Sequence, residues 1–363
     1  AFGILLLSGC SIGIPPTPIT VGPTLQAETQ IPIPSKTPIP LDSIATPKLP
    51  LTPTRQTKSY ETIDRSNAAR LVEITSSHIE NIGRMYWLPD AKAIAVLSLR
   101  HFLILEPETL AVQKDLPIPE GETLLDFEPI HQLLAVTTDR NSVIVKDMGG
   151  KTVQTISQAG GFGSAAFSFS GDSIWLSSME KFEAAAYAIQ TGKRASACGG
   201  FETAAPVYAA FQSPGGKWLV WMARATIQLS QIPSCQPAAR IGHEDFIISH
   251  AFSSDEQTLV TSTEGTLNGE FQPLVFFWDA NTGKQKFVFP LVDSSASGLA
   301  FSSNAEVLVT AGSGLIVWDV STKKEIIKLA ETDKRFTSVV FSPDGTILVA
   351  STEDSIHMYA VKP

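Results

Sequence analysis

The sequence predicts an all-β protein whose main domain is a seven-bladed β-propeller. Three observations predict this fold. An aromatic residue followed by a turn-forming sequence recurs along the chain, each recurrence precedes a run of β-branched residues, and one extra strand precedes the first repeat. Of the 363 residues, 43% are hydrophobic and 17% are charged. This balance suffices for one large domain with a buried core.

The repeat is recognised by its aromatic anchors. Their successive spacings are 40, 40, 44, 41, 49 and 40 residues. A period of about 40–45 residues is typical of four-stranded propeller blades, with one blade for each repeat. The seven anchors are Trp87, Phe127, Phe167, Phe211, Phe252, Phe301 and Phe341.

The last repeat shows the order of strands and turns. Its first strand ends at Phe341, and residues 342–345 (Ser-Pro-Asp-Gly) predict a tight turn, because proline presets φ and glycine accepts the left-handed region. A second strand follows at residues 347–350, and a third ends near Tyr359. Too few residues remain for a fourth strand. We therefore expect residues 70–75 to pair with the last blade and close the ring.

Several dipeptides identify the kind of repeat. Two third strands end in Trp-Asp, and the fifth repeat opens with Gly-His, which resembles WD40 repeats. The other repeats are degenerate at these positions, so the resemblance depends mainly on the period. It implies a rigid ring that binds protein or peptide partners. The dipeptides are Trp278-Asp279, Trp318-Asp319 and Gly242-His243.

The N-terminal residues predict an exported protein with a lipid anchor. Residues 1–9 form a short apolar run like the last part of a signal peptide, too short to span a bilayer. Leu7-Ser8-Gly9-Cys10 resembles the lipobox of bacterial lipoproteins. The resemblance implies a diacylglycerol group on Cys10 and a location outside the cytoplasm, on the bacterial cell membrane or envelope. The alternative is a cysteine that happens to follow a cleaved secretory signal.

The segment after Cys10 has the composition of a tether. Residues 11–57 contain eleven of the 24 prolines and many threonines. Proline removes amide donors, so this stretch cannot pair into a sheet. We therefore expect residues 10–57 to form a disordered tether and residues 58–363 to form the propeller. An unmodified spacer is favoured over an O-glycosylated one.

Charge and motif content bear on several function classes. The net charge is −9 and no dense Lys/Arg cluster occurs, which argues against a nucleic-acid partner. His243-Glu244 begins like the zinc motif His-Glu-x-x-His, but Ile247 replaces the second histidine. We interpret His243 as packed against a neighbouring strand. No nucleophile elbow or phosphate-binding loop is recognised, so we expect no catalytic site, metal or cofactor. We also expect the chain to be a monomer.

Two cysteines fall within the predicted propeller. Cys198 is expected late in the outer strand of the third blade, and Cys235 in the turn after the third strand of the fourth blade. A disulfide is chemically possible in an oxidising compartment. Because the two positions are expected at opposite rims of the ring, two free thiols are favoured over a disulfide.

The longest interval between anchors predicts a binding loop. It contains an insertion between the second and third strands of the fifth repeat, at residues 263–273, and Asn268-Gly269 is a strong signal for a two-residue hairpin turn. Loops on a rigid scaffold commonly carry function. Glu264, Asn268, Glu270 and Phe271 are therefore candidate partner-binding residues. A neutral insertion is an equally open alternative.

The function hypotheses follow from these features. The leading one is a non-catalytic scaffold, displayed at the cell surface by its lipid anchor, that binds a protein or peptide. The alternative is an extracytoplasmic enzyme, or a propeller that binds a sugar or cofactor, with a site at the central channel. Carboxylate, histidine or arginine side chains converging at one mouth of the channel would favour it. A third hypothesis, support of an envelope assembly, predicts a large apolar patch on the outer strands.

Overall fold

A computed structural model describes residues 60–139, 141–158, 161–178, 183–199, 207–291, 295–330 and 335–362. The predicted remnant of a signal peptide at residues 1–9, the lipidation site Cys10 and the tether over residues 10–57 lie outside the described residues. These assignments therefore stay predictions.

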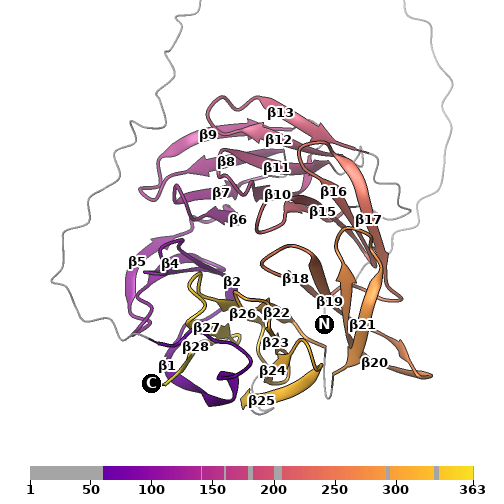
Figure 1. Cartoon of the computed structure of the whole chain (residues 1–363). Coiled ribbons are helices and arrows are strands. Elements are labelled where there is room, and N and C mark those ends of the chain that lie inside the picture. Colours follow the sequence, from indigo (N-terminus) through magenta and orange to yellow (C-terminus); the bar gives the residue numbers. More distant parts are fainter. Residues whose placement is uncertain are drawn as a thin grey trace, which may run out of the picture. The chain divides into compact units, whose positions relative to one another are not determined.

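Apart from one turn of 3₁₀ helix at Ala68–Arg70, the regular structure of the described residues consists of β-strands. The strands form seven four-stranded antiparallel sheets. Figure 1 shows these sheets arranged as blades around a common axis, each with one strand at the centre and one at the periphery. The predicted seven-bladed propeller is confirmed.

Six blades are built from four consecutive strands each. From the inner strand outwards, blades one to three are β2 (Ile82–Trp87), β3 (Ile94–Ser98), β4 (His101–Leu105) and β5 (Val112–Pro117); β6 (Thr123–Glu128), β7 (Leu133–Thr137), β8 (Ser142–Lys146) and β9 (Thr152–Ser157); β10 (Phe162–Phe167), β11 (Ser173–Ser178), β12 (Ala184–Ala188) and β13 (Arg194–Cys198). Blades four to six are β14 (Ala209–Gln212), β15 (Trp218–Ala223), β16 (Thr226–Gln231) and β17 (Gln236–Gly242); β18 (Ser249–Phe252), β19 (Thr258–Leu267), β20 (Glu270–Asp279) and β21 (Gln285–Pro290); β22 (Gly298–Phe301), β23 (Val307–Ala311), β24 (Leu315–Asp319) and β25 (Lys324–Ala330).

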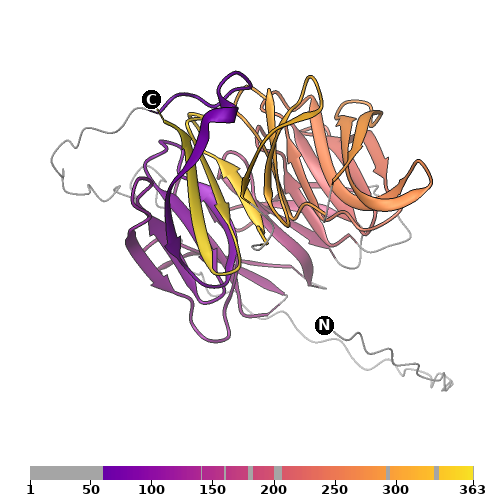
Figure 2. The same cartoon turned by 90° about the horizontal axis from the view of Figure 1, so that it is seen from below.

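The seventh blade closes the ring with strands from both ends of the propeller. It contains β26 (Ser338–Phe341), β27 (Ile347–Ser351), β28 (Ser355–Val361) and, as its outer strand, β1 (Leu71–His78). The pairing runs from Leu71 opposite Val361 to His78 opposite Ser355. Figure 2 shows the indigo strand β1 alongside the yellow strands of this blade. The predicted closure by an N-terminal strand is confirmed.

The hydrophobic core is divided among the interfaces between blades. Seven clusters of buried side chains occur, one for each pair of neighbouring blades. The interface between blades seven and one is as fully formed as the others, with Val349 and Met358 packed near Met85 and Ile94. Burial of apolar surface on both faces of each blade therefore holds the ring together.

A buried serine follows the aromatic anchor in five blades and organises the first turn. Its hydroxyl accepts a hydrogen bond from the backbone N–H five residues later, at donor–acceptor distances of 2.9–3.1 Å. This bond satisfies an amide that begins the second strand, which would otherwise be buried without a partner. The five serines are Ser168, Ser213, Ser253, Ser302 and Ser342.

The expectation of two free thiols is wrong, because Cys198 and Cys235 form a disulfide with their Cα atoms 5.2 Å apart. Cys198 ends the outer strand β13 and Cys235 follows β16, as the sequence predicts. The expectation placed the two cysteines at opposite rims because it took all four strands of a blade to run parallel to the axis of the ring. Adjacent strands are rotated by about 20–25°, and over three steps the outer strand leans strongly toward its neighbour. The ends of β13 and β16 therefore meet at the outer edge of the ring.

Candidate functional site

The insertion in blade five forms the predicted hairpin. Strands β19 and β20 have ten residues each, whereas the second and third strands of the other blades have five to seven. Leu267 pairs with Glu270 across the turn. Asn268 and Gly269 both have positive φ, of 56° and 86°. This conformation defines a two-residue hairpin turn whose twist matches the right-handed twist of its two strands. Asparagine and glycine tolerate positive φ best.

The base of the hairpin is fixed to the loop between blades four and five. The Thr263 hydroxyl donates to the carbonyl of Phe246 at 2.8 Å, and the Thr266 amide donates to a carboxylate oxygen of Glu244 at 2.9 Å. On the other side, the Ser295 hydroxyl donates to a carboxylate oxygen of Glu264 at 3.1 Å. Glu264 therefore helps to anchor the hairpin to the neighbouring loop, in addition to any role in binding.

Exposed apolar side chains lie on the same rim. Phe271 is 61% exposed on the hairpin, and Phe246 and Ile248 are 51% and 42% exposed on the loop. The guanidinium of Arg224 lies over the Phe246 ring, 4.7 Å from its centroid. The strands alternate in direction, so loops between blades and turns between second and third strands share one rim. Phe246, Ile248 and Arg224 were not among the predicted site residues, although two apolar residues in a loop between blades were a usable signal.

These residues form one surface, which we call the hairpin surface. It also carries the carboxylates of Glu244, Asp245, Glu264 and Glu270, and none of the four makes an ion pair with another described residue. The hairpin surface comprises Arg224, residues 244–246, Ile248, Glu264 and residues 268–271. Its aromatic rings surrounded by carboxylates suit a partner that combines apolar and basic groups.

His243 has a structural role, as the sequence analysis interpreted it. Its Nε2 lies 3.1 Å from the Thr261 hydroxyl, which accepts a hydrogen bond from the Trp278 indole at 2.9 Å. The imidazole packs edge-on against Phe276 and Trp278. Burial lowers the pKa of His243 to about 4, so the ring is neutral at pH 7. Groups of three or more His, Cys, Asp or Glu side chains that could hold a metal ion are absent from the described residues.

A polar cluster connects the inner strands of blades one to three. Asp126 accepts hydrogen bonds from the Tyr86 hydroxyl at 2.6 Å and from the Phe167 amide at 2.9 Å. Arg84 Nη1 lies 3.8 Å from the same carboxylate. Burial raises the pKa of Asp126, and the Tyr86 and Phe167 donors and the charge of Arg84 act in the opposite direction. The cluster ties three blades together at the centre of the ring.

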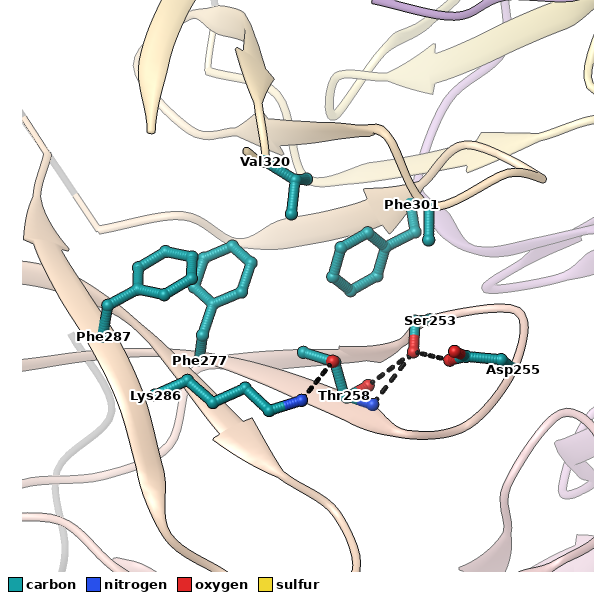
Figure 3. A pocket seen from close by; sticks show the side chains of 9 residues that line it. Ser253, Asp255, Thr258, Phe277, Lys286, Phe287, Phe301 and Val320 are labelled. Carbon is teal, nitrogen blue, oxygen red and sulfur yellow. Dashed lines mark hydrogen bonds between the residues drawn. The ribbon is translucent and has the colours of Figure 1, made fainter. Parts of the chain in front are cut away.

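A small pocket lies on the opposite rim, between blades five and six. Its volume is about 190 Å³, and the rings of Phe277, Phe287 and Phe301 form its walls (Figure 3). At its floor, Lys286 donates to the Thr258 hydroxyl at 2.9 Å, and the Ser253 hydroxyl is bonded within its own turn. The polar groups at the floor thus have protein partners, and the pocket offers only a narrow apolar space.

Comparison with known proteins defines the class. Residues 324–359 match the family described as WD domain, G-beta repeat (WD40). The match covers the outer strand of blade six and most of blade seven. The chain is therefore a seven-bladed propeller that carries a WD40 repeat, and propellers of this class are typically scaffolds for protein interaction.

One relative is similar over about a fifth of the chain. Over 84 residues the chain is 34% identical to Superkiller complex protein 8 of Dictyostelium discoideum. The matched part is 22% of this chain and only 25% of that protein. A search for membrane-spanning helices in the described part of the chain finds none of sufficient length and hydropathy.

Proposed function

We propose that the protein is a non-catalytic scaffold that binds a protein or peptide through the hairpin surface. The observation that carries this proposal is the set of exposed apolar side chains Phe246, Ile248 and Phe271 on loops held by hydrogen bonds. Fully burying a side chain of this size contributes about 1.5–3 kcal/mol. Because these loops are already ordered before binding, little of their conformational entropy is lost when a partner binds.

We also infer that the propeller is displayed outside the cytoplasm by a lipid on Cys10, as a monomer. The disulfide between Cys198 and Cys235 supports this location, because disulfides persist mainly in oxidising compartments. The name of the similar Dictyostelium protein refers to a complex, which supports a partner-binding role for this chain as well.

The test of partner binding uses the full chain in detergent-solubilised membranes. A protein captured by the unaltered chain is identified, and its affinity is then measured for two variants. The double variant Glu270→Ala, Phe271→Ala should weaken binding at least tenfold, because it removes the exposed ring and a carboxylate of the hairpin. Leu99→Ala is the matched control, since Leu99 is exposed on the corresponding turn of blade one. Equal affinity for both variants would eliminate the hairpin surface as the binding site.

The lipid anchor has its own test. Cys10→Ser should release the full chain from the membrane fraction, whereas Cys235→Ser should leave it there. Mass spectrometry of the N-terminal peptide should find diacylglycerol on Cys10. A Cys10→Ser protein that stays with the membrane would contradict the anchor without affecting the propeller.

A second candidate function is ligand binding at the centre of the ring by an extracytoplasmic propeller. The alternative hypothesis required histidine, arginine or carboxylate side chains to converge there. Arg84 on β2 and Asp126 on β6 lie 3.8 Å apart on neighbouring inner strands. This pair of opposite charges on inner strands supports a central ligand in addition to a partner at the rim.

A further inference from the structure

The pocket between blades five and six has aromatic walls and room for one ring. Phe277 and Phe287 are stacked with their ring centroids 3.9 Å apart, and Phe301 stands edge-on to Phe277 at 6.1 Å. Phe277 is buried, whereas Phe287 and Phe301 are half-buried and border the open space in Figure 3. An apolar cavity of about 150 Å³ is large enough to bind benzene. The volume of about 190 Å³ therefore admits one six-membered ring with a small substituent.

The floor of the pocket keeps one hydrogen-bond donor for a ligand. The ammonium group of a lysine carries three N–H groups. Lys286 Nζ donates to the Thr258 hydroxyl at 2.9 Å and to the Gln257 carbonyl at 3.3 Å. Its distance to Asp279 Oδ2 is 3.8 Å, which is too long for a hydrogen bond. The acceptors in the described part of the chain therefore use two of the N–H groups of Lys286, and the third is left for a bound molecule.

A carboxylate at the edge of the pocket offers an acceptor. Asp255 lines the pocket, and its Oδ1 accepts hydrogen bonds from the Ser253 hydroxyl at 2.6 Å and from the Gln257 amide at 3.0 Å. Both bonds from described residues reach the same oxygen atom. A carboxylate accepts hydrogen bonds at both of its oxygens, so Oδ2 of Asp255 can accept one from a ligand.

The charged groups that border the pocket balance one another. The ammonium of Lys286 lies near the carboxylate of Asp279, and the ammonium of Lys323 lies 4.3 Å from the centroid of the Phe287 ring. Together with Asp255, these groups contribute two positive and two negative charges. An ionic ligand would be attracted by one pair and repelled by the other. The pocket therefore favours a neutral ligand over an ion.

We propose that this pocket binds a phenol ring, either in a free small molecule or as the tyrosine side chain of a peptide. The ring packs among the phenylalanine side chains, because edge-to-face and offset contacts between aromatic rings are favourable. The phenol hydroxyl accepts a hydrogen bond from Lys286 and donates one to Asp255. The site lies on the rim opposite the hairpin surface, and it is independent of both functions proposed above.

The test compares phenols with matched molecules that lack the hydroxyl, on the full chain. p-Cresol and toluene represent the free ring, and N-acetyl-tyrosinamide and N-acetyl-phenylalaninamide represent the side chain of a peptide. Binding is measured by ligand-observed NMR, with affinities from titration. The unaltered protein should bind p-cresol at least about tenfold more tightly than toluene, because toluene cannot accept the hydrogen bond from the charged donor.

Three variants locate the effect. Lys286→Met keeps the apolar stem but removes the N–H groups, so the affinity for p-cresol should fall to that for toluene, which should not change. Lys284→Met is the matched control, since Lys284 is exposed two residues earlier and does not line the pocket. It should keep the preference for p-cresol. Val320→Trp should fill the space and abolish binding of both molecules. The comparison of p-cresol with toluene on the unaltered protein holds even if Val320→Trp fails to fold.

Each result decides the proposal. Binding of p-cresol without N-acetyl-tyrosinamide identifies a free phenol as the ligand, and binding of both shows that the tyrosine of a peptide is accepted; either supports the site if it depends on Lys286. Failure of both phenols to bind at millimolar concentration overturns the proposal. Equal affinity for p-cresol and toluene also overturns it, as does a preference that survives Lys286→Met or binding that survives Val320→Trp in folded protein. None of these results bears on the hairpin surface.

Discussion

Reduction of the disulfide between Cys198 and Cys235 should destabilise the propeller by a predictable amount. The two cysteines are 37 residues apart in the sequence. Closing a loop of this length in the unfolded chain removes entropy worth about 4 kcal/mol at 25 °C. An unfolding entropy of about 2.1 cal/mol/K per residue gives about 0.6 kcal/mol/K for about 300 residues. The midpoint of thermal unfolding should therefore fall by about 6 °C on reduction.

The assay is differential scanning calorimetry with and without a reductant that keeps the thiols free. The double variant Cys198→Ala, Cys235→Ala is the matched control. It should unfold near the temperature of the reduced protein and should not respond to the reductant. Peptide mapping after alkylation shows whether Cys198 and Cys235 are bonded before reduction. Two results would refute the assignment of the disulfide and the reasoning about blade twist. Either both cysteines react with the alkylating reagent before reduction, or the midpoint of thermal unfolding is the same with and without the reductant.

Three further predictions concern the inner strands and turns. The pKa values of His243 and His250 are about 4 in the folded protein and about 6.5 in the unfolded chain. As the pH falls from 6.5 to 4, the unfolded chain therefore takes up protons that the folded protein does not. The free energy of unfolding should fall over this range by up to about 3 kcal/mol for each histidine. Denaturant titrations should show a smaller fall in His250→Phe, and an unchanged fall would contradict the assigned burial. Asp126→Ala should cost about 2–4 kcal/mol, measured by chemical unfolding, because the Phe167 amide and the Tyr86 hydroxyl lose their acceptor; Asp126→Asn, which keeps an acceptor, should cost less. Ser342→Ala should cost about 1–2 kcal/mol by the same measurement, and no loss would mean that water replaces the hydroxyl.

The fold was predictable because its signals are local and repeated. Each anchor, such as Phe341, lies at the end of an inner strand or one residue before it, and each period of the sequence supplies strands of one blade. The blade five hairpin was predictable for the same reason, since Asn268-Gly269 specifies its turn whatever surrounds it. The closing strand was predictable because an extra strand, at residues 70–75, precedes the first repeat, and β1 does pair with β28.

Contacts between blades were decided only by the tertiary structure. Residues 198 and 235 meet because twist accumulates from the inner to the outer strand, and no pattern in the sequence reports that rotation. Phe246 joins the hairpin surface because Thr263 and Thr266 bond to its loop. Asp126 meets Tyr86 and Phe167 because the ring places the inner strands of blades one, two and three side by side. The sequence by itself determined the blades and their number, since those depend on neighbours along the chain. The ring determined which side chains meet, because those distances depend on packing between distant segments.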